Sequence, residues 1–243
     1  MPPARSTRLA LVDVLRGFAV AQMIVYHFIY DLSHFGWITL WMTRDQPWVG
    51  WRTAIVTQFL LLVGVSLVLR MSFKPGFGDF LRRWAEVAAA AALVSAGSWL
   101  VFGPRFIWFG ILHFIAVALL LSRPLVRLGA WNLALALVAF VAWLVYADPV
   151  FNETPANVIG FVTQKPRTED YVPLFPWLAA VLVGIGIGAL WQRAGWRVPA
   201  WLAPIERHPP RVLRFLGTWA LTVYLVHQPV LMGAMLLLKK LGL

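Results

Sequence analysis

The sequence predicts an all-α integral membrane protein, a polytopic bundle of about seven transmembrane helices. Of its 243 residues, 60% are hydrophobic and only 13% are charged, whereas soluble domains average about 45–50% apolar and about 25% charged residues. Apolar stretches long enough to cross a bilayer recur along the whole chain. Many of the 14 tryptophans and 16 phenylalanines lie near the ends of these stretches, as in the aromatic belts of membrane proteins.

The seven predicted spans follow from the length and periodicity of the apolar runs. They cover residues 9–31, 50–70, 83–102, 106–122, 128–147, 176–193 and 213–238. The fourth is short because Gly103-Pro104-Arg105 must form a tight turn before it. Gly184-xxx-Gly188 in the sixth span predicts a close helix contact. Since no repeat or linker interrupts the pattern, residues 1–243 are predicted to form one integral domain.

The distribution of basic residues predicts the orientation of the chain. With the N-terminus inside, 14 of the 21 lysines and arginines fall on inner segments and 7 on outer ones. Because these residues favour cytoplasmic loops, we expect the N-terminus inside and the C-terminus outside. Inner loops beside anionic lipid also explain the net charge of +11 without nucleic acid. The absence of cysteine excludes disulfides and thiolate metal sites.

The first predicted span carries five ionisable residues on one face. At 100° per residue they fall within about 60° of one another around the helix. These residues are Asp13, Arg16, His27, Asp31 and His34. A charge near the middle of a bilayer costs at least about 2.5–3.5 kcal/mol, so such residues usually face the protein interior or a watery cavity. This face is therefore the first candidate for a functional site.

Three histidines are predicted to lie at similar depth in the outer half of the membrane: His27, His113 and His227. His27 and Asp31 are four residues apart on one helix, so the carboxylate can orient and charge the imidazole. One face of the last span holds Tyr224, His227 and Gln228. An interhelical hydrogen bond explains a single membrane histidine equally well, but three at one depth beside Asp31 favour a functional site.

Two further regions are candidates for ligand contacts. Near the inner surface, Asp13 and Arg16 are joined by a basic cluster of Arg70, Lys74, Arg82 and Arg83. Such a cluster can bind a polyanionic cytoplasmic ligand through its phosphates. Ordinary positive-inside flanking explains Arg70 and Lys74 better, so Arg16 and Arg83 are the stronger candidates. At the outer surface, Asp170, Tyr171 and Trp177 belong to a proline-containing segment that is predicted to line a substrate mouth.

Four motifs together resemble one family. They are Asp13-Val-Leu-Arg16-Gly17-Phe-Ala followed by Tyr26-His27, Gly110-Ile-Leu-His113, Asp170-Tyr171-Val-Pro-Leu-Phe-Pro176-Trp177, and Tyr224-Leu-Val-His227-Gln228-Pro229. The chain resembles, over nearly its whole length, the bacterial branch of the heparan-α-glucosaminide N-acetyltransferase catalytic-domain family. The first motif is also similar to transmembrane acyltransferases that O-acetylate bacterial surface polysaccharides.

The resemblance implies a multi-pass acetyltransferase of the bacterial cytoplasmic (inner) membrane. Acetyl-CoA would bind from the cytoplasm, and the acetyl group would reach an amino sugar or hydroxyl of an extracytoplasmic glycan. Arg16 and Arg83, with Asp13 and Arg82 beside them, would hold the CoA phosphates. No metal is expected. Eukaryotic members carry a histidine after the first span, so His27 and His34 both stay candidates for the residue that matches it.

For the chemistry we predict general-base acyl transfer. His27, oriented by Asp31, takes the proton from the acceptor, which then attacks the thioester carbonyl. A hydrogen bond from His113, Tyr224 or His227 stabilises the developing oxyanion. Direct transfer and an acetyl-histidine intermediate both stay open.

Two other functions compete with acyl transfer. Paired histidines on different helices can ligate haem, although haem leaves the basic residues without a role. Intramembrane aspartate and histidine also suit a proton-coupled small-molecule transporter, although duplicated halves are not visible in the sequence. The acceptor, the acyl chain length and the formation of a homodimer stay open.

Overall fold

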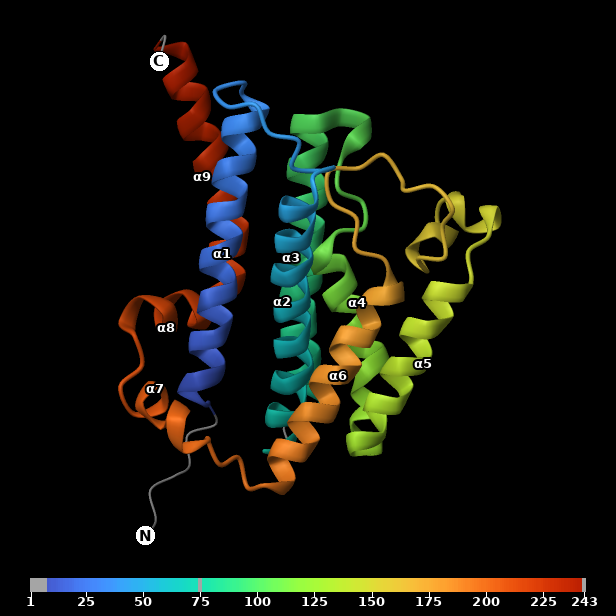
Figure 1. Ribbon diagram of the computed structural model, residues 1–243, viewed down its shortest axis with the longest axis vertical. Coiled ribbons are helices and arrows are strands. Elements are labelled where there is room, and N and C mark those ends of the chain that lie inside the picture. Colours follow the sequence, from blue (N-terminus) through green and yellow to red (C-terminus); the bar gives the residue numbers. More distant parts are fainter. Residues whose placement is uncertain (1–7, 74–75, 242–243) are drawn as a thin grey trace. The chain divides into compact units, whose positions relative to one another are not determined.

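The computed structural model describes residues 8–73 and 76–241 (Figure 1). In these ranges the regular structure is helical, and one isolated bridge joins Phe109 and Tyr171. The α-helices are α1 (Ala10–His34), α2 (Gln46–Ser72), α3 (Phe77–Phe102), α4 (Ile111–Leu125), α5 (Asn132–Val145), α6 (Leu174–Arg193), α7 (Ala203–Arg207), α8 (Arg211–Thr218) and α9 (Ala220–Lys240). Short 3-10 helices cover Gly103–Arg105, Val126–Trp131, Pro149–Asn152, Ala156–Val158 and Ala200–Leu202. The all-α prediction is confirmed.

Six stretches of the described chain are long and apolar enough to cross a membrane. They are Ala10–His34, Gln46–Ser72, Phe77–Arg105, Ile111–Val145, Leu174–Arg193 and Ala220–Lys240. The predicted fourth and fifth spans, 106–122 and 128–147, both overlap the single stretch Ile111–Val145. Gly129 divides this stretch, because its φ of 57° and ψ of −128° are not helical. The structure therefore indicates a multi-pass membrane protein, while the count of seven and the orientation of the termini stay predictions.

The prediction for the last span was wrong at its start. Residues 213–238 were expected to form one helix, but α8 ends at Thr218 and α9 begins at Ala220. Trp219 separates them with φ −102° and ψ 23°. The apolar pattern runs through this break, so it does not reveal that α8 packs across α1 before the chain turns into α9 (Figure 1).

The contacts divide the chain into two compact units. One contains the described residues of Met1–Phe59 and Val198–Leu243, and the other is Leu60–Arg197. The boundary at Phe59 falls inside the continuous helix α2. This position explains why the sequence shows no linker between the units, and the single integral domain stays a prediction.

In the first unit, α1 packs against α7, α8 and α9. The helices α1 and α9 run in the same direction (Figure 1). The apolar core of this unit consists of Val20, Met23, Tyr26, Met42 and Ile55. At the start of α1, the Glu206 carboxylate accepts hydrogen bonds from the backbone N–H groups of Ala10 at 3.1 Å and Leu11 at 2.7 Å. This carboxylate satisfies helix N-terminal donors that otherwise have no partner.

In the second unit, α3 packs against α4, and α5 packs along α6. Two glycines bring backbones together at the contact between α2 and α6. A Cβ on Gly64 would collide with the Val181 carbonyl oxygen, and one on Gly184 would collide with the Leu61 carbonyl oxygen. The predicted close contact at Gly184 is thus confirmed, and only glycine fits these two positions.

Candidate active site

Two histidines from the first and last helices meet in the first unit. His27 Nδ1 on α1 lies 2.8 Å from His227 Nε2 on α9. Their rings stack with centroids 4.9 Å apart and an interplanar angle of 29°. His227 Nδ1 lies 2.7 Å from the backbone carbonyl oxygen of Tyr224. The structure thus brings together the predicted site residues His27 and His227, which are 200 positions apart in the sequence.

The Tyr224 carbonyl determines which ring nitrogens carry protons in the neutral pair. A carbonyl can only accept, so His227 Nδ1 must hold a hydrogen and donate it. His227 Nε2 then has a lone pair and accepts from the Nδ1–H of His27. In neutral His27 the remaining nitrogen, Nε2, therefore carries a lone pair. This arrangement prepares His27 Nε2 to take a proton.

The prediction that Asp31 orients His27 was wrong. Asp31 is 1% exposed, and its Oδ1 accepts a hydrogen bond of 2.8 Å from Gln228 Nε2 of α9. The partner of His27 is His227. The spacing of four residues on α1 suggested a local pair, but the packed helix α9 supplies partners for both side chains. Gln228 was recognised from the sequence only as a neighbour of His227.

The inner end of the same α1 face meets α8. The Arg16 guanidinium donates through Nη1 to Asp13 Oδ1 at 2.9 Å and to the Gly217 carbonyl oxygen at 3.2 Å. Asp13 is buried. The face of α1 that carries the ionisable stripe is thus the face covered by α8 and α9. Glu206, which caps the start of α1, was missed because nothing in its local sequence indicates that contact.

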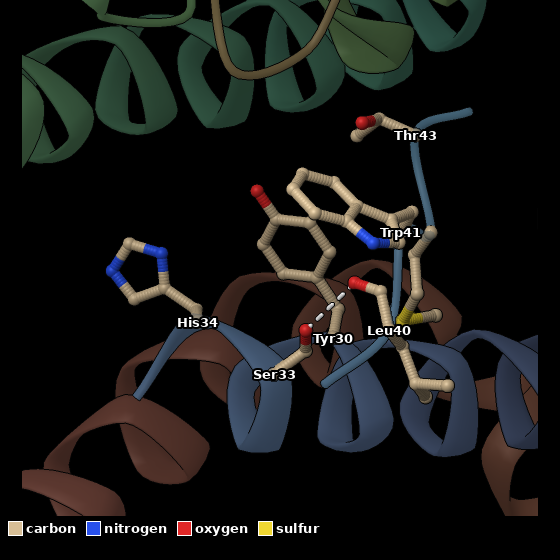
Figure 2. A pocket seen from close by; sticks show the side chains of 7 residues that line it. Tyr30, Ser33, His34, Leu40, Trp41 and Thr43 are labelled. Carbon is tan, nitrogen blue, oxygen red and sulfur yellow. Dashed lines mark hydrogen bonds between the residues drawn. The ribbon is translucent and has the colours of Figure 1, made fainter. Parts of the chain in front are cut away.

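His34, the last residue of the stripe, is exposed and lines a separate pocket. This cavity of about 160 Å³ lies between the end of α1 and the loop that follows it. Figure 2 shows Tyr30 between His34 and Trp41. Below them, the Ser33 hydroxyl donates a hydrogen bond to the Leu40 carbonyl. The rings of Tyr30 and His34 stack at 6.3 Å. Sequence reasoning missed Trp41 because the loop brings it back over α1.

His113 belongs to the second unit and has local partners for both ring nitrogens. The Gly110 N–H donates to its Nδ1 at 3.3 Å, so Nε2 of the neutral ring carries the hydrogen. Nε2 lies 3.0 Å from Ser95 Oγ, which in turn donates to the Ile107 carbonyl at 2.7 Å. These bonds tie α3 to the start of α4. The predicted depth of His113 in the membrane, similar to that of His27, stays a prediction.

The proposed substrate-mouth residues also lie in the second unit. Asp170 Oδ2 accepts from the Ile111 N–H at 2.9 Å, so it caps the N-terminus of α4. Tyr171 pairs with Phe109 in the isolated bridge, and its hydroxyl donates to the Asn157 carbonyl at 2.6 Å. Trp177 is half-buried near the start of α6. The two polar residues thus have structural partners, and their role at a mouth stays a prediction.

The Tyr171 hydroxyl gives the second unit a testable pH dependence. Burial raises the pKa of Tyr171 from 10.0 to about 12. Because the pKa is higher in the folded protein than in the unfolded chain, the protonated hydroxyl contributes to the stability of the fold. This contribution is complete below pH 10.0 and is lost as the pH rises to about 12. Tyr171→Phe is expected to remove this component when unfolding is measured across that pH range. Identical pH curves for both proteins would contradict it.

The predicted basic cluster is partly paired. Arg82 Nε lies 3.7 Å and Arg83 Nη1 lies 3.8 Å from the Glu86 carboxylate, and both arginine side chains are more than half exposed. Arg70 donates to the Asp79 carbonyl at 3.3 Å. Lys74 lies outside the described residues. The proposed contacts of Arg82 and Arg83 with CoA stay predictions. In the described part of the chain, no group of three or more histidine or acidic residues could hold a metal ion.

Comparison with known proteins identifies the family of the chain. The model of the family "Heparan-alpha-glucosaminide N-acetyltransferase, catalytic" matches residues 8–229. No curated protein and no solved structure gives a match. The matched range contains the whole α1 stripe and both members of the histidine pair. The chain therefore belongs to the heparan-alpha-glucosaminide N-acetyltransferase catalytic family, and with its apolar helices it is a membrane protein of an acyltransferase family.

Proposed function

We propose that the protein transfers an acetyl group from cytoplasmic acetyl-CoA to an amino sugar or hydroxyl of an extracytoplasmic glycan in the bacterial inner membrane. The observation that carries this proposal is the chain of contacts from His27 through His227 to the Tyr224 carbonyl. These contacts leave His27 Nε2 with a lone pair, and all three residues lie within the range that the family model matches. Neutral imidazole is the base that acyl transfer to an amine or hydroxyl needs.

In the proposed reaction, His27 Nε2 removes the proton from the acceptor nitrogen or oxygen. The acceptor then forms a bond to the thioester carbonyl carbon, and the carbon–sulfur bond breaks. The proton passes from His27 to the departing CoA sulfur, so the base is regenerated. While His27 is positively charged, its hydrogen bond to His227 strengthens. His227 thus takes the place of the carboxylate in a catalytic triad, oriented by the Tyr224 carbonyl.

Of the predicted oxyanion donors, Tyr224 fits this geometry best. Its ring lies 5.7 Å from the His227 ring on the same face of α9. His227 uses both nitrogens in the pair, and His113 uses both nitrogens in its bonds to Gly110 and Ser95. We therefore assign the oxyanion contact to the Tyr224 hydroxyl. A hydroxyl donor at this position typically contributes about 10²–10³-fold to the rate.

For acetyl-CoA we propose contacts with the basic residues at the predicted inner end. Asp13 fixes the guanidinium of Arg16 through the bond of 2.9 Å, so the arginine is held ready in one orientation. Arg82 and Arg83 have exposed side chains that can approach phosphate. Guanidinium groups match phosphate with paired hydrogen bonds, which is the chemistry that CoA recognition requires.

For the acceptor we propose the pocket beyond the histidine pair. It combines the aromatic faces of Tyr30 and Trp41 with the polar groups of His34 and Thr43 (Figure 2). Trp41 is 60% exposed, so its indole can stack against a ligand. Tyr30 lies one helical turn from His27. The pocket therefore adjoins the base along α1.

Removing the indole should weaken acceptor binding more than it slows the chemistry. We expect Trp41→Ala to raise KM for the acceptor about tenfold, with a smaller change in kcat. The measurement is steady-state acetyl transfer with the acceptor varied at saturating acetyl-CoA. Trp131→Ala, which removes an exposed tryptophan of the second unit, is the matched control. An unchanged KM in Trp41→Ala would exclude the pocket as the acceptor site.

The proposed function is tested by CoA release from acetyl-CoA by the purified protein, with and without a panel of amino sugars. Acceptor-dependent release supports an acetyltransferase. The absence of both release and acetyl-CoA binding would favour the transporter, for which solute uptake without CoA consumption is the direct assay. Haem ligation by the pair is disfavoured, because both His227 nitrogens already have partners within hydrogen-bonding distance.

A further inference from the structure

We infer that Asp31 and Gln228 form an uncharged acid–amide pair, in which Asp31 carries a proton and positions His227 against His27. This inference rests on the proposed function only for its activity measurement. It concerns two residues next to the histidine pair, one on α1 and one on α9. It replaces the role of a charged partner for His27 that the sequence suggested for Asp31.

The first argument is the pairing of the polar atoms. Gln228 Nε2 donates to Asp31 Oδ1 at 2.8 Å. The other oxygen of each group, Asp31 Oδ2 and Gln228 Oε1, is buried and has no hydrogen-bond partner. Buried polar atoms are nearly always satisfied, so two unsatisfied acceptors on bonded partners call for an explanation. One proton on Asp31 Oδ2, donated to Gln228 Oε1, satisfies both and closes a ring of two hydrogen bonds.

The second argument is the surroundings of the carboxyl group. The titratable and charged residues on the two helices that carry the pair are, towards the end of α1, Tyr26, His27, Tyr30 and His34, and, on α9, Tyr224, His227, Lys239 and Lys240. The loop after α1 and the start of α2 add Arg44, Asp45 and Arg52. Within the described ranges, Asp31 takes part in no ion pair. If Asp31 were ionised, its carboxylate would be 1% exposed and would be stabilised by a single hydrogen bond. Such burial is far more costly than binding a proton.

The consequence concerns the geometry of the base. Gln228 directly follows His227, so the contact that holds Gln228 on Asp31 also fixes the position of His227 along α1. An uncharged Asp31 does not pull a proton onto His27, which leaves its Nε2 lone pair available. Asp31 and Gln228 are therefore positioning residues, which act through His227 and do not contact the acceptor.

The direct test is infrared spectroscopy of the purified full-length protein. A protonated carboxylic acid has a carbonyl band that is separate from the bands of carboxylates. We expect this band in the wild type from about pH 6 to about pH 9, well above the ordinary range for aspartic acid. It should be lost in Asp31→Asn and kept in the matched control Asp45→Asn, which changes an exposed aspartate. A wild type without the band overturns the inference.

A conservative rescue provides the second test. The amide of Asp31→Asn can accept from Gln228 Nε2 and donate to Gln228 Oε1, so it reproduces both bonds of the uncharged pair. Asp31→Leu reproduces neither. We expect Asp31→Leu to lower the transfer rate and the Tm, with about tenfold or greater loss in rate. Asp31→Asn should restore the Tm and most of the rate, with a pH profile of the wild-type shape.

A charged Asp31 predicts the opposite result. Asparagine would then be as damaging as leucine, because both remove the charge, and this outcome overturns the inference. If the wild type releases no CoA with any acceptor, the proposed function fails. The infrared band and the Tm of the two variants still decide the state of Asp31 in that case.

Discussion

Replacing His27 with alanine is expected to reduce acetyl transfer by about 10²–10⁴-fold, the range typical of a lost general base. In the structure His27 Nδ1 is bonded to His227, so only Nε2 can take a proton from the acceptor. The variant should still bind acetyl-CoA, because the basic residues proposed for that contact are unchanged. The measurement is CoA release at saturating substrates, together with acetyl-CoA binding by calorimetry.

His34→Ala is the control that separates the two histidines of α1. His34 lies in the exposed pocket and has no contact with the His27–His227 pair among the bonds described. We expect His34→Ala to change mainly KM for the acceptor, with kcat within about tenfold of the wild type. The reverse result, in which only His34→Ala abolishes turnover, would transfer the role of base to His34.

Replacing Gly217 with leucine is expected to prevent α8 from packing on α1. A Cβ on Gly217 would collide with the Asp13 carbonyl oxygen, and one on Gly17 would collide with the Leu213 carbonyl oxygen. Both obstacles are backbone atoms of helices, which cannot move aside as a side chain can. Forcing extra atoms into a well-packed core typically costs about 1–3 kcal/mol, so we expect Gly217→Leu to lower the free energy of unfolding by at least this much.

The measurement for Gly217→Leu is thermal unfolding of the purified protein, with Gly17→Leu as a second test of the same contact. Gly233→Ala is the matched control in α9, because a Cβ at this position meets nothing within 4 Å. This control should be neutral or more stable by up to about 1 kcal/mol, since alanine favours helix. Equal stability of Gly217→Leu and Gly233→Ala would contradict the close contact.

The face of α1 that carries the site could be predicted, because helical periodicity depends only on neighbouring residues. Asp13, Arg16, His27 and Asp31 lie where 100° per residue places them, and the energetic cost of burying them predicted that protein covers this face. The family motifs also follow from local sequence. Likewise, Gly184 was recognised as a close contact from the spacing of small residues alone.

The partners across this face could not be predicted. The bonds of His27 to His227 and of Asp31 to Gln228 depend on the register of α9 on α1. That register depends on where α8 ends, and the apolar pattern hides the break at Trp219. Trp41 reaches the pocket only through the path of a loop. For His113, the chain shows no local signal that Ser95, 18 residues away, would bind its ring.

The two histidines of the pair come from α1 and α9, at opposite ends of the chain, and this separation has a consequence for biosynthesis. The ribosome makes α1 long before α8 and α9, which cover its ionisable face. At ordinary synthesis rates this interval is about 10–40 s. During that time Arg16 lacks the Gly217 carbonyl of α8, and His27 and Asp31 lack His227 and Gln228 of α9. Nascent chains that stop before α9 are therefore expected to keep a polar helix face without its covering helices.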